Sequence, residues 1–436
     1  MPETSLYLVL ISVLFGFLLG IITGLTPGLH VNNVALLLVA FSPVLLEHGF
    51  APLYIAIIIV ANAIAHTFLD FIPSIFLGAP EADTALAVLP GHQLLLEGKG
   101  VEAIRLSAIG SAGSVIVALL LVLPLGILFQ NVYGIISQHM GWILLFIVII
   151  MIWTERGEMV EDSFTGAHFR YKGCAVLIFL LSGLLGLLSF TKGFLMAPII
   201  VFGEPSVLFP LFSGLFGASM LLISLLTQTE VPDQIRTEFK LSKEKIVRGV
   251  FTGSLAGSLV SWLPGVSSAV ATVIARLAIR EDHEEDSTRE FIVAVSGVNT
   301  ANAIFSLVAL YVIQRARSGA MVAVNSTLPA GWDLSIVVLF LTVIVGVSIA
   351  SYFITILIGD HASQALSHLN YPRLCAMVLI GLGTMAILFT GLFGMAIFAV
   401  ATLIGALPSY LKVKKTHAMG VLLFPLILYF FGLFVW

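Results

Sequence analysis

The chain has 436 residues, of which 59% are apolar and only 10% are Asp, Glu, Lys or Arg, whereas about 25% are charged in a soluble domain. Its 20 basic and 24 acidic residues give a net charge of −4 and form no long basic face, which excludes a water-soluble or nucleic-acid-binding protein. Two cysteines cannot build a disulfide framework or a four-cysteine zinc site, and no P-loop or HExxH motif occurs. The acidic run at 281–286 is expected to be a solvated loop, because nothing fixes a ligand geometry there. We therefore expect no catalytic residues, no metal site and no resident cofactor.

Long apolar runs follow one another along the chain, beginning with residues 6–22. A helix needs about 20 apolar residues to cross the hydrocarbon core, and many of the runs reach that length. The first run has no basic residue before it and no clear cleavage site after it, so we expect a retained helix rather than a signal peptide. The sequence thus predicts an all-α, multi-pass protein of the cell membrane with about 10–14 transmembrane or re-entrant helices.

Two Pro-Gly pairs occupy equivalent places in the two parts of the chain, Pro27-Gly28 and Pro264-Gly265, and each of these two is expected to break a helix near the middle of the membrane. Irregular backbone persists at that depth only where it is buried in protein or lines a cavity. A helix start presents free N–H groups and partial positive charge, so two such starts would cradle a carboxylate or phosphate. For one copy alone, a kink that only packs helices is the alternative. The residues expected to bind the anion are Thr26, Gly28, His30, Asn32 and Asn33 around the first pair, and Gly265, Ser267 and Ser268 around the second.

Polar side chains also interrupt the apolar runs. Asn62, Asn299 and Asn302 either bind the substrate or hold neighbouring helices by hydrogen bonds. Asp70 is costly in lipid and is a functional candidate, and His66 lies four residues earlier on the same helix face. The sequence predicts that these two residues couple transport to Na⁺ or a proton. The alternative is an interfacial aspartate near a helix end.

A set of residues recurs at a constant separation. The first copy holds Gly16, Gly20, Pro27, Gly28 and Asn62, and the second holds Gly253, Gly257, Pro264, Gly265 and Asn299. These residue types have special backbone or polar roles, so their match indicates an internal repeat. Basic segments at 236–248 and 412–415 are expected in the cytoplasm, and the start of the chain, which has no basic residue, is expected outside. The copies are therefore expected to be inverted repeats, comprising residues 1–245 and 246–436.

Two segments of the first half carry a resemblance to a known family. They are residues 20–28, Gly-Ile-Ile-Thr-Gly-Leu-Thr-Pro-Gly, and residues 79–91, which continue through Glu97-Gly98-Lys99-Gly100. With the second Pro-Gly pair and the region of Asn299, in the same order, the sequence resembles the large membrane subunit of the tripartite tricarboxylate transporter family.

The resemblance implies a secondary transporter of carboxylates that is driven by an ion gradient. It also implies a small membrane subunit and an extracytoplasmic solute-binding protein as partners, and a substrate path along residues 79–91. The substrate is then a small organic anion, moved by alternating access. Residues 264–267 also resemble the Pro-Gly-Val-Ser segment of polyprenyl-phosphate translocases, so a carrier of lipid phosphate is the alternative function.

Overall fold

The computed structural model describes the chain except residues 1–4, 27–30, 41, 48–50, 80–83, 156–166, 201–204, 228–231, 233, 235–240, 264–267, 280–283, 329–331, 368–370 and 434–436. The described residues form helices and their connections, with no strand among them. The predicted all-α class is confirmed.

Eight helical segments of the described chain are long and apolar enough to cross a membrane. They are α1 (Leu6–Leu25), α4 with α5 (Pro52–Leu69 and Phe71–Phe76), α7 (Gly100–Gln138), α9 (Ala167–Thr191), α10 to α11 (Leu208–Phe212 and Ser219–Leu226, joined by the π-helix η3, Ser213–Ala218), α14 (Glu284–Ile313), α16 (Leu334–Ser367) and α17 (Tyr371–Leu411). Shorter apolar helices are η1 with α6 (Ala85–Ala87 and Val88–Leu96), α8 (Met140–Trp153), α13 (Ser268–Ala278) and η4 with α18 (Lys415–Met419 and Gly420–Phe430). The other helices are α2 (Val31–Ala40), α3 (Ser42–Glu47), η2 (Gly193–Leu195), α12 (Lys243–Val260) and α15 (Gly319–Thr327). The described residues thus hold eight candidate spans, and the total of about 10–14 spanning or re-entrant helices remains a prediction.

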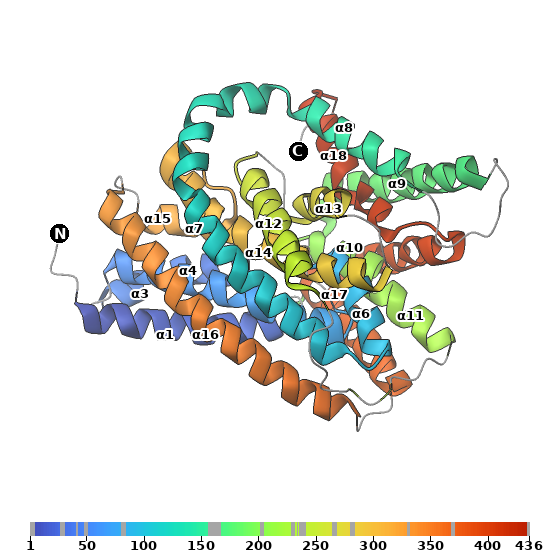
Figure 1. Cartoon of the computed structure of the whole chain (residues 1–436), viewed down its shortest axis with the longest axis horizontal. Helices are drawn as coiled ribbons and strands as arrows, with labels where there is room; N and C mark the ends of the chain where they lie inside the picture. The colour runs from blue at the N-terminus through green and yellow to red at the C-terminus, as the bar shows by residue number, and fades with distance from the viewer. Residues whose placement is uncertain are drawn as a thin grey trace.

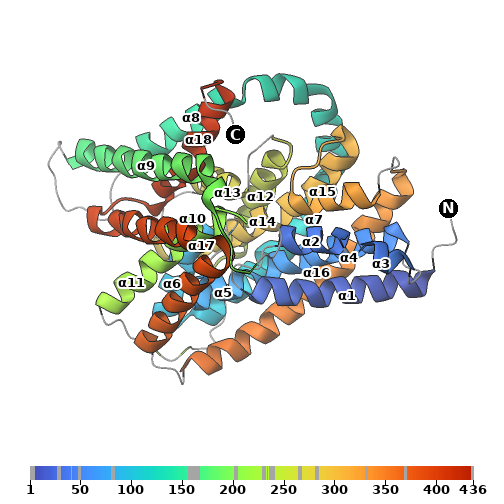
Figure 2. The same cartoon turned by 180° about the vertical axis from the view of Figure 1, so that it is seen from behind.

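Helices α4 and α14 form the centre of the protein. The apolar stretch of α4 with α5 is wholly buried, and that of α14 is nearly so. Helices α1 and α16 run along one side, whereas α8, α9 and α18 gather on the opposite side (Figures 1 and 2). The outer helices expose large apolar side chains such as Leu18, Leu120 and Phe353, which a hydrocarbon solvent accommodates. The chain is a multi-pass protein of the plasma membrane.

The helices break on either side of both Pro-Gly pairs, as predicted. Helix α1 ends at Leu25 and its C-cap Thr26 has extended backbone, and α2 begins at Val31. Helix α12 ends at Val260, and α13 begins at Ser268. The two Pro-Gly pairs themselves lie outside the described residues, so the cradle between the helix starts remains a prediction.

Glycine allows two helix pairs to pack closely. A Cβ atom at Gly20 of α1 would overlap the side chain of Ala65 in α4, and one at Gly257 of α12 would overlap the carbonyl oxygen of Val298 in α14. Small residues at a helix interface allow such close backbone contact in a membrane. The matching glycines of the sequence thus serve matching contacts. The inverted relation of the halves and their division at residue 245 remain predictions.

Candidate functional site

Three polar side chains line one face of α4. Asn62, His66 and Asp70 are spaced four residues apart, and they are 0%, 4% and 2% exposed. Asp70 caps the end of α4, where α5 follows at once, and its side chain is buried inside the protein. Burying a carboxylate at such a place is costly, and the contacts around it show how the cost is reduced.

Helix α1 contributes Thr23 to this face. The Thr23 hydroxyl lies 3.1 Å from Oδ1 of Asn62 and 3.0 Å from Nδ1 of His66. The close packing at Gly20, one turn earlier, brings the short threonine side chain within reach of both groups. Nδ2 of Asn62 is buried and has no hydrogen-bond partner among the described residues, so this amide keeps a donor for another group.

Helix α14 closes the cluster from the second half of the chain. Nδ2 of Asn299 donates to Oδ2 of Asp70 at 2.8 Å, and the next residue, Thr300, bonds Thr67 of α4 through the two hydroxyls at 3.1 Å. Both bonds are buried. We call Thr23, Asn62, His66, Asp70 and Asn299 the central polar cluster.

Both ring nitrogens of His66 face other members of the central polar cluster. Nδ1 lies 3.0 Å from the Thr23 hydroxyl, and which of the two atoms donates depends on the tautomer of the ring. Nε2 lies 4.0 Å from Oδ2 of Asp70, close enough for an ion pair when the ring is protonated. Carboxylate, amide and hydroxyl oxygens of this kind also suit a hard cation.

The central polar cluster is tied to the segment that follows residue 83. The Ser74 hydroxyl donates to the Asp70 carbonyl and lies 2.7 Å from the Thr84 hydroxyl. Thr84 immediately precedes η1 and α6, so this bond holds η1 beside the end of α4.

The other predicted site residues divide into three groups. Thr26 is half-buried at the end of α1, and Ser268 is buried at the first turn of α13. Asn32 accepts from the backbone N–H of Ala320 at the start of α15, and Asn302 is half-buried outside the central polar cluster. The residues outside the described part of the chain are Gly28, His30, Gly265 and Ser267, and for Asn33 the side chain is not described. Their roles in binding remain predictions.

Thr23, Thr67 and Thr300 are site residues that were not predicted from the sequence. Thr23 lies in the 20–28 segment that carries the family resemblance, and its spacing of three residues from Gly20 places it on the same helix face as that glycine. Thr67 and Thr300 have no such signal, because threonine is common in membrane helices and its partner depends on how the helices cross.

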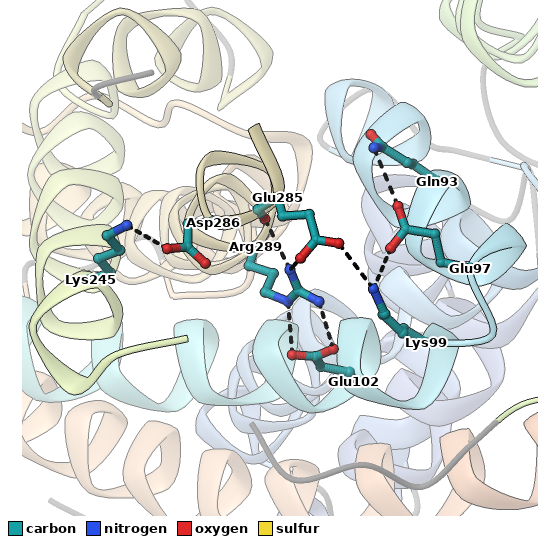
Figure 3. A network of polar contacts seen from close by, with 8 residues as sticks. All are labelled: Gln93, Glu97, Lys99, Glu102, Lys245, Glu285, Asp286 and Arg289. Atoms are coloured by element: carbon teal, nitrogen blue, oxygen red, sulfur yellow. Dashed lines mark hydrogen bonds and ion pairs between the residues drawn. The ribbon is translucent and has the colours of Figure 1, made fainter. Parts of the chain in front are cut away.

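A second polar network lies outside the central polar cluster. Arg289 of α14 forms a bidentate pair with Glu102 of α7, at 2.9 and 3.3 Å, and also contacts Glu285, which Lys99 bonds in turn (Figure 3). The hydrogen bond to Glu97 raises the pKa of Lys99, so its ammonium stays protonated at neutral pH. The network continues to Gln93 on one side, and a separate pair joins Lys245 to Asp286. It fastens α7 and the α6–α7 connection to α14.

Comparison with known proteins gives one family. The model described as the tripartite tricarboxylate transporter TctA family matches residues 10–420. An uncharacterized protein of Methanocaldococcus jannaschii is 29% identical over 433 residues, which cover 97% of this chain and 98% of that protein. No solved structure matches the chain.

Proposed function

The chain belongs to the tripartite tricarboxylate transporter TctA family, and from this premise we propose that it carries di- or tricarboxylate anions by ion-coupled alternating access. The family consists of transporter components, which agrees with the many apolar helices. A tripartite system has further members. We propose that these are a small membrane subunit and an extracytoplasmic solute-binding protein.

The anion is held, in this proposal, at the helix starts that follow the two Pro-Gly pairs. The ends of α1 and α12 and the new starts of α2 and α13 support it, because such starts attract anions. The free N–H donor of Asn62 supports a role for this amide in binding a carboxylate oxygen or its water.

The central polar cluster supplies the coupling site. The observation that carries this proposal is the contact between Nε2 of His66 and Oδ2 of Asp70, which lie 4.0 Å apart in the protein interior. A proton or Na⁺ bound between them neutralises the carboxylate and lowers the cost of moving it past apolar groups. Because Asn299 comes from the other half, a relative movement of α4 and α14 changes the contacts of Asp70. The loaded carrier therefore changes state more readily than the empty one.

Uptake by proteoliposomes tests the proposal. Labelled citrate and succinate are supplied outside, and Na⁺ and proton gradients are imposed separately. We expect accumulation under at least one gradient, and its loss in Gly28→Leu and Gly265→Leu. Gly134→Leu is the matched control, because nothing lies within 4 Å of a Cβ atom at Gly134. Full uptake by the Gly28 and Gly265 variants would contradict the anion cradle. Translocation of a polyprenyl phosphate without carboxylate uptake would favour the lipid carrier.

A further inference from the structure

Among the lysines and arginines of the described part of the chain, two side chains are buried, Arg289 and Lys415. Arg289 is neutralised by Glu102 and Glu285. Lys415, the first residue of η4, is 6% exposed and pairs with no carboxylate among the described residues. An ammonium group buried without a counter-charge is costly, and an anion that enters the site removes the cost.

The ammonium is held by neutral oxygens. Nζ of Lys415 donates to the carbonyl of Phe216 at 3.2 Å and to Oγ of Ser219 at 2.8 Å. Ser219 donates its own hydrogen to Leu215, so a lone pair faces the lysine. These two acceptors use two of the three ammonium hydrogens. Phe216 lies in the π-helix η3, and short π-helical insertions within α-helices occur frequently at functional sites.

The surrounding loop positions Lys415 without neutralising it. Oε2 of Glu155 lies 2.6 Å from Nε2 of His417 and accepts from the backbone N–H of Lys414 at 3.2 Å. Glu155 and His417 are both buried. The carboxylate that fixes η4 is thus used by Lys414 and His417 and not by Lys415. Burial lowers the pKa of the Lys415 ammonium to about 7, and an anion that binds beside it favours the charged form.

Lys415 is also connected to the proposed substrate path. Its helix η4 packs against α13, which begins directly after the second Pro-Gly segment. The π-helix that binds Lys415 packs against η1, and Thr84 before η1 bonds Ser74 beside Asp70.

We propose that Lys415 binds a carboxylate group of the transported anion, and this inference rests on the proposed function. An anion with two or more carboxylates places one on Lys415 and another at the helix starts, whereas a monocarboxylate fills one position. Lys415 therefore makes the carrier select di- and tricarboxylates. A buried charge–charge contact of this kind contributes strongly to affinity when its partner is present.

Thermal stabilisation of the purified full chain by citrate, succinate and acetate tests this selection. The variant Lys415→Gln removes the charge and keeps an N–H donor for the Phe216 carbonyl, and Lys415→Met is a second neutral variant. Lys412→Gln is the matched control, because Lys412 is exposed three residues earlier. We expect Lys415→Gln to raise the citrate concentration for half-maximal stabilisation by about tenfold or more, with little change for acetate. The ligand-free melting temperature should stay equal or rise, since an uncompensated buried charge is removed.

Several results would overturn the inference. A citrate response like that of the wild type in either neutral variant would remove Lys415 from binding while leaving the proposed function in place. Failure of both variants to fold would make Lys415 a structural residue. Stabilisation by a polyprenyl phosphate that depends on Lys415, without a carboxylate response, would assign the lysine to a lipid phosphate. If the wild type responds to no carboxylate, the proposed function and this inference both fail.

Discussion

Asn299 of α14 donates a hydrogen bond of 2.8 Å to the carboxylate of Asp70 at the end of α4. The two residues are 229 positions apart in the sequence. The bond joins the two predicted halves of the chain at a place where both side chains are almost fully buried. A buried carboxylate that is held by a residue of the opposite half senses how the halves are arranged. The proposed coupling role of Asp70 rests on this relation.

Replacing Asn299 by Leu should destabilise the protein and disturb coupling. Oδ2 of Asp70 loses a buried donor, which costs about 1–3 kcal/mol. We expect a lower melting temperature in detergent and a higher ion concentration for half-maximal uptake. Asn302→Leu is the control, since Asn302 lies one turn later and outside the central polar cluster. Equal effects of the two substitutions would argue against a special role for Asn299.

Replacing Gly20 by Ala should disrupt the packing of α1 on α4. The added Cβ would overlap Ala65 and lie 2.8 Å from the Asn62 carbonyl, so α1 must move away and carry Thr23 with it. The yield of folded protein in size-exclusion chromatography should fall, and uptake should fall with it. Gly134→Ala adds the same methyl group in open space and should leave both unchanged. A Gly20→Ala variant with normal yield and uptake would show that the contact is dispensable.

Replacing Arg289 by Met should destabilise the protein strongly. The substitution leaves Glu102 buried without its cation, which costs about 3–5 kcal/mol. The double variant Arg289→Met with Glu102→Met removes both charges and should recover most of the lost melting temperature. Additive losses in the double variant would mean that the two residues do not act as a pair.

The sequence predicted the features that depend on local chemistry. Pro27 and Pro264 indicated two helix breaks, and both are present between α1 and α2 and between α12 and α13. The i, i+4 spacing of His66 and Asp70 placed both on one face, and the structure brings them within 4.0 Å.

The features that depend on how distant helices meet were not predicted. The sequence left Asp70 open as an interfacial residue, because the depth of a side chain in a bundle depends on packing with α14. Lys415 was grouped with Lys412 and Lys414 as a cytoplasmic basic segment. Its burial against η3 follows from the path of the chain before α18, which hydropathy does not encode.

The most direct test of the coupling site is the gradient dependence of uptake in Asp70→Asn proteoliposomes. The substitution keeps the size and a hydrogen-bond partner for Asn299 but removes the charge that a proton or Na⁺ neutralises. We predict that exchange of labelled citrate for internal citrate continues, while accumulation driven by the ion gradient disappears. Gradient-driven accumulation equal to that of the wild type would contradict the account.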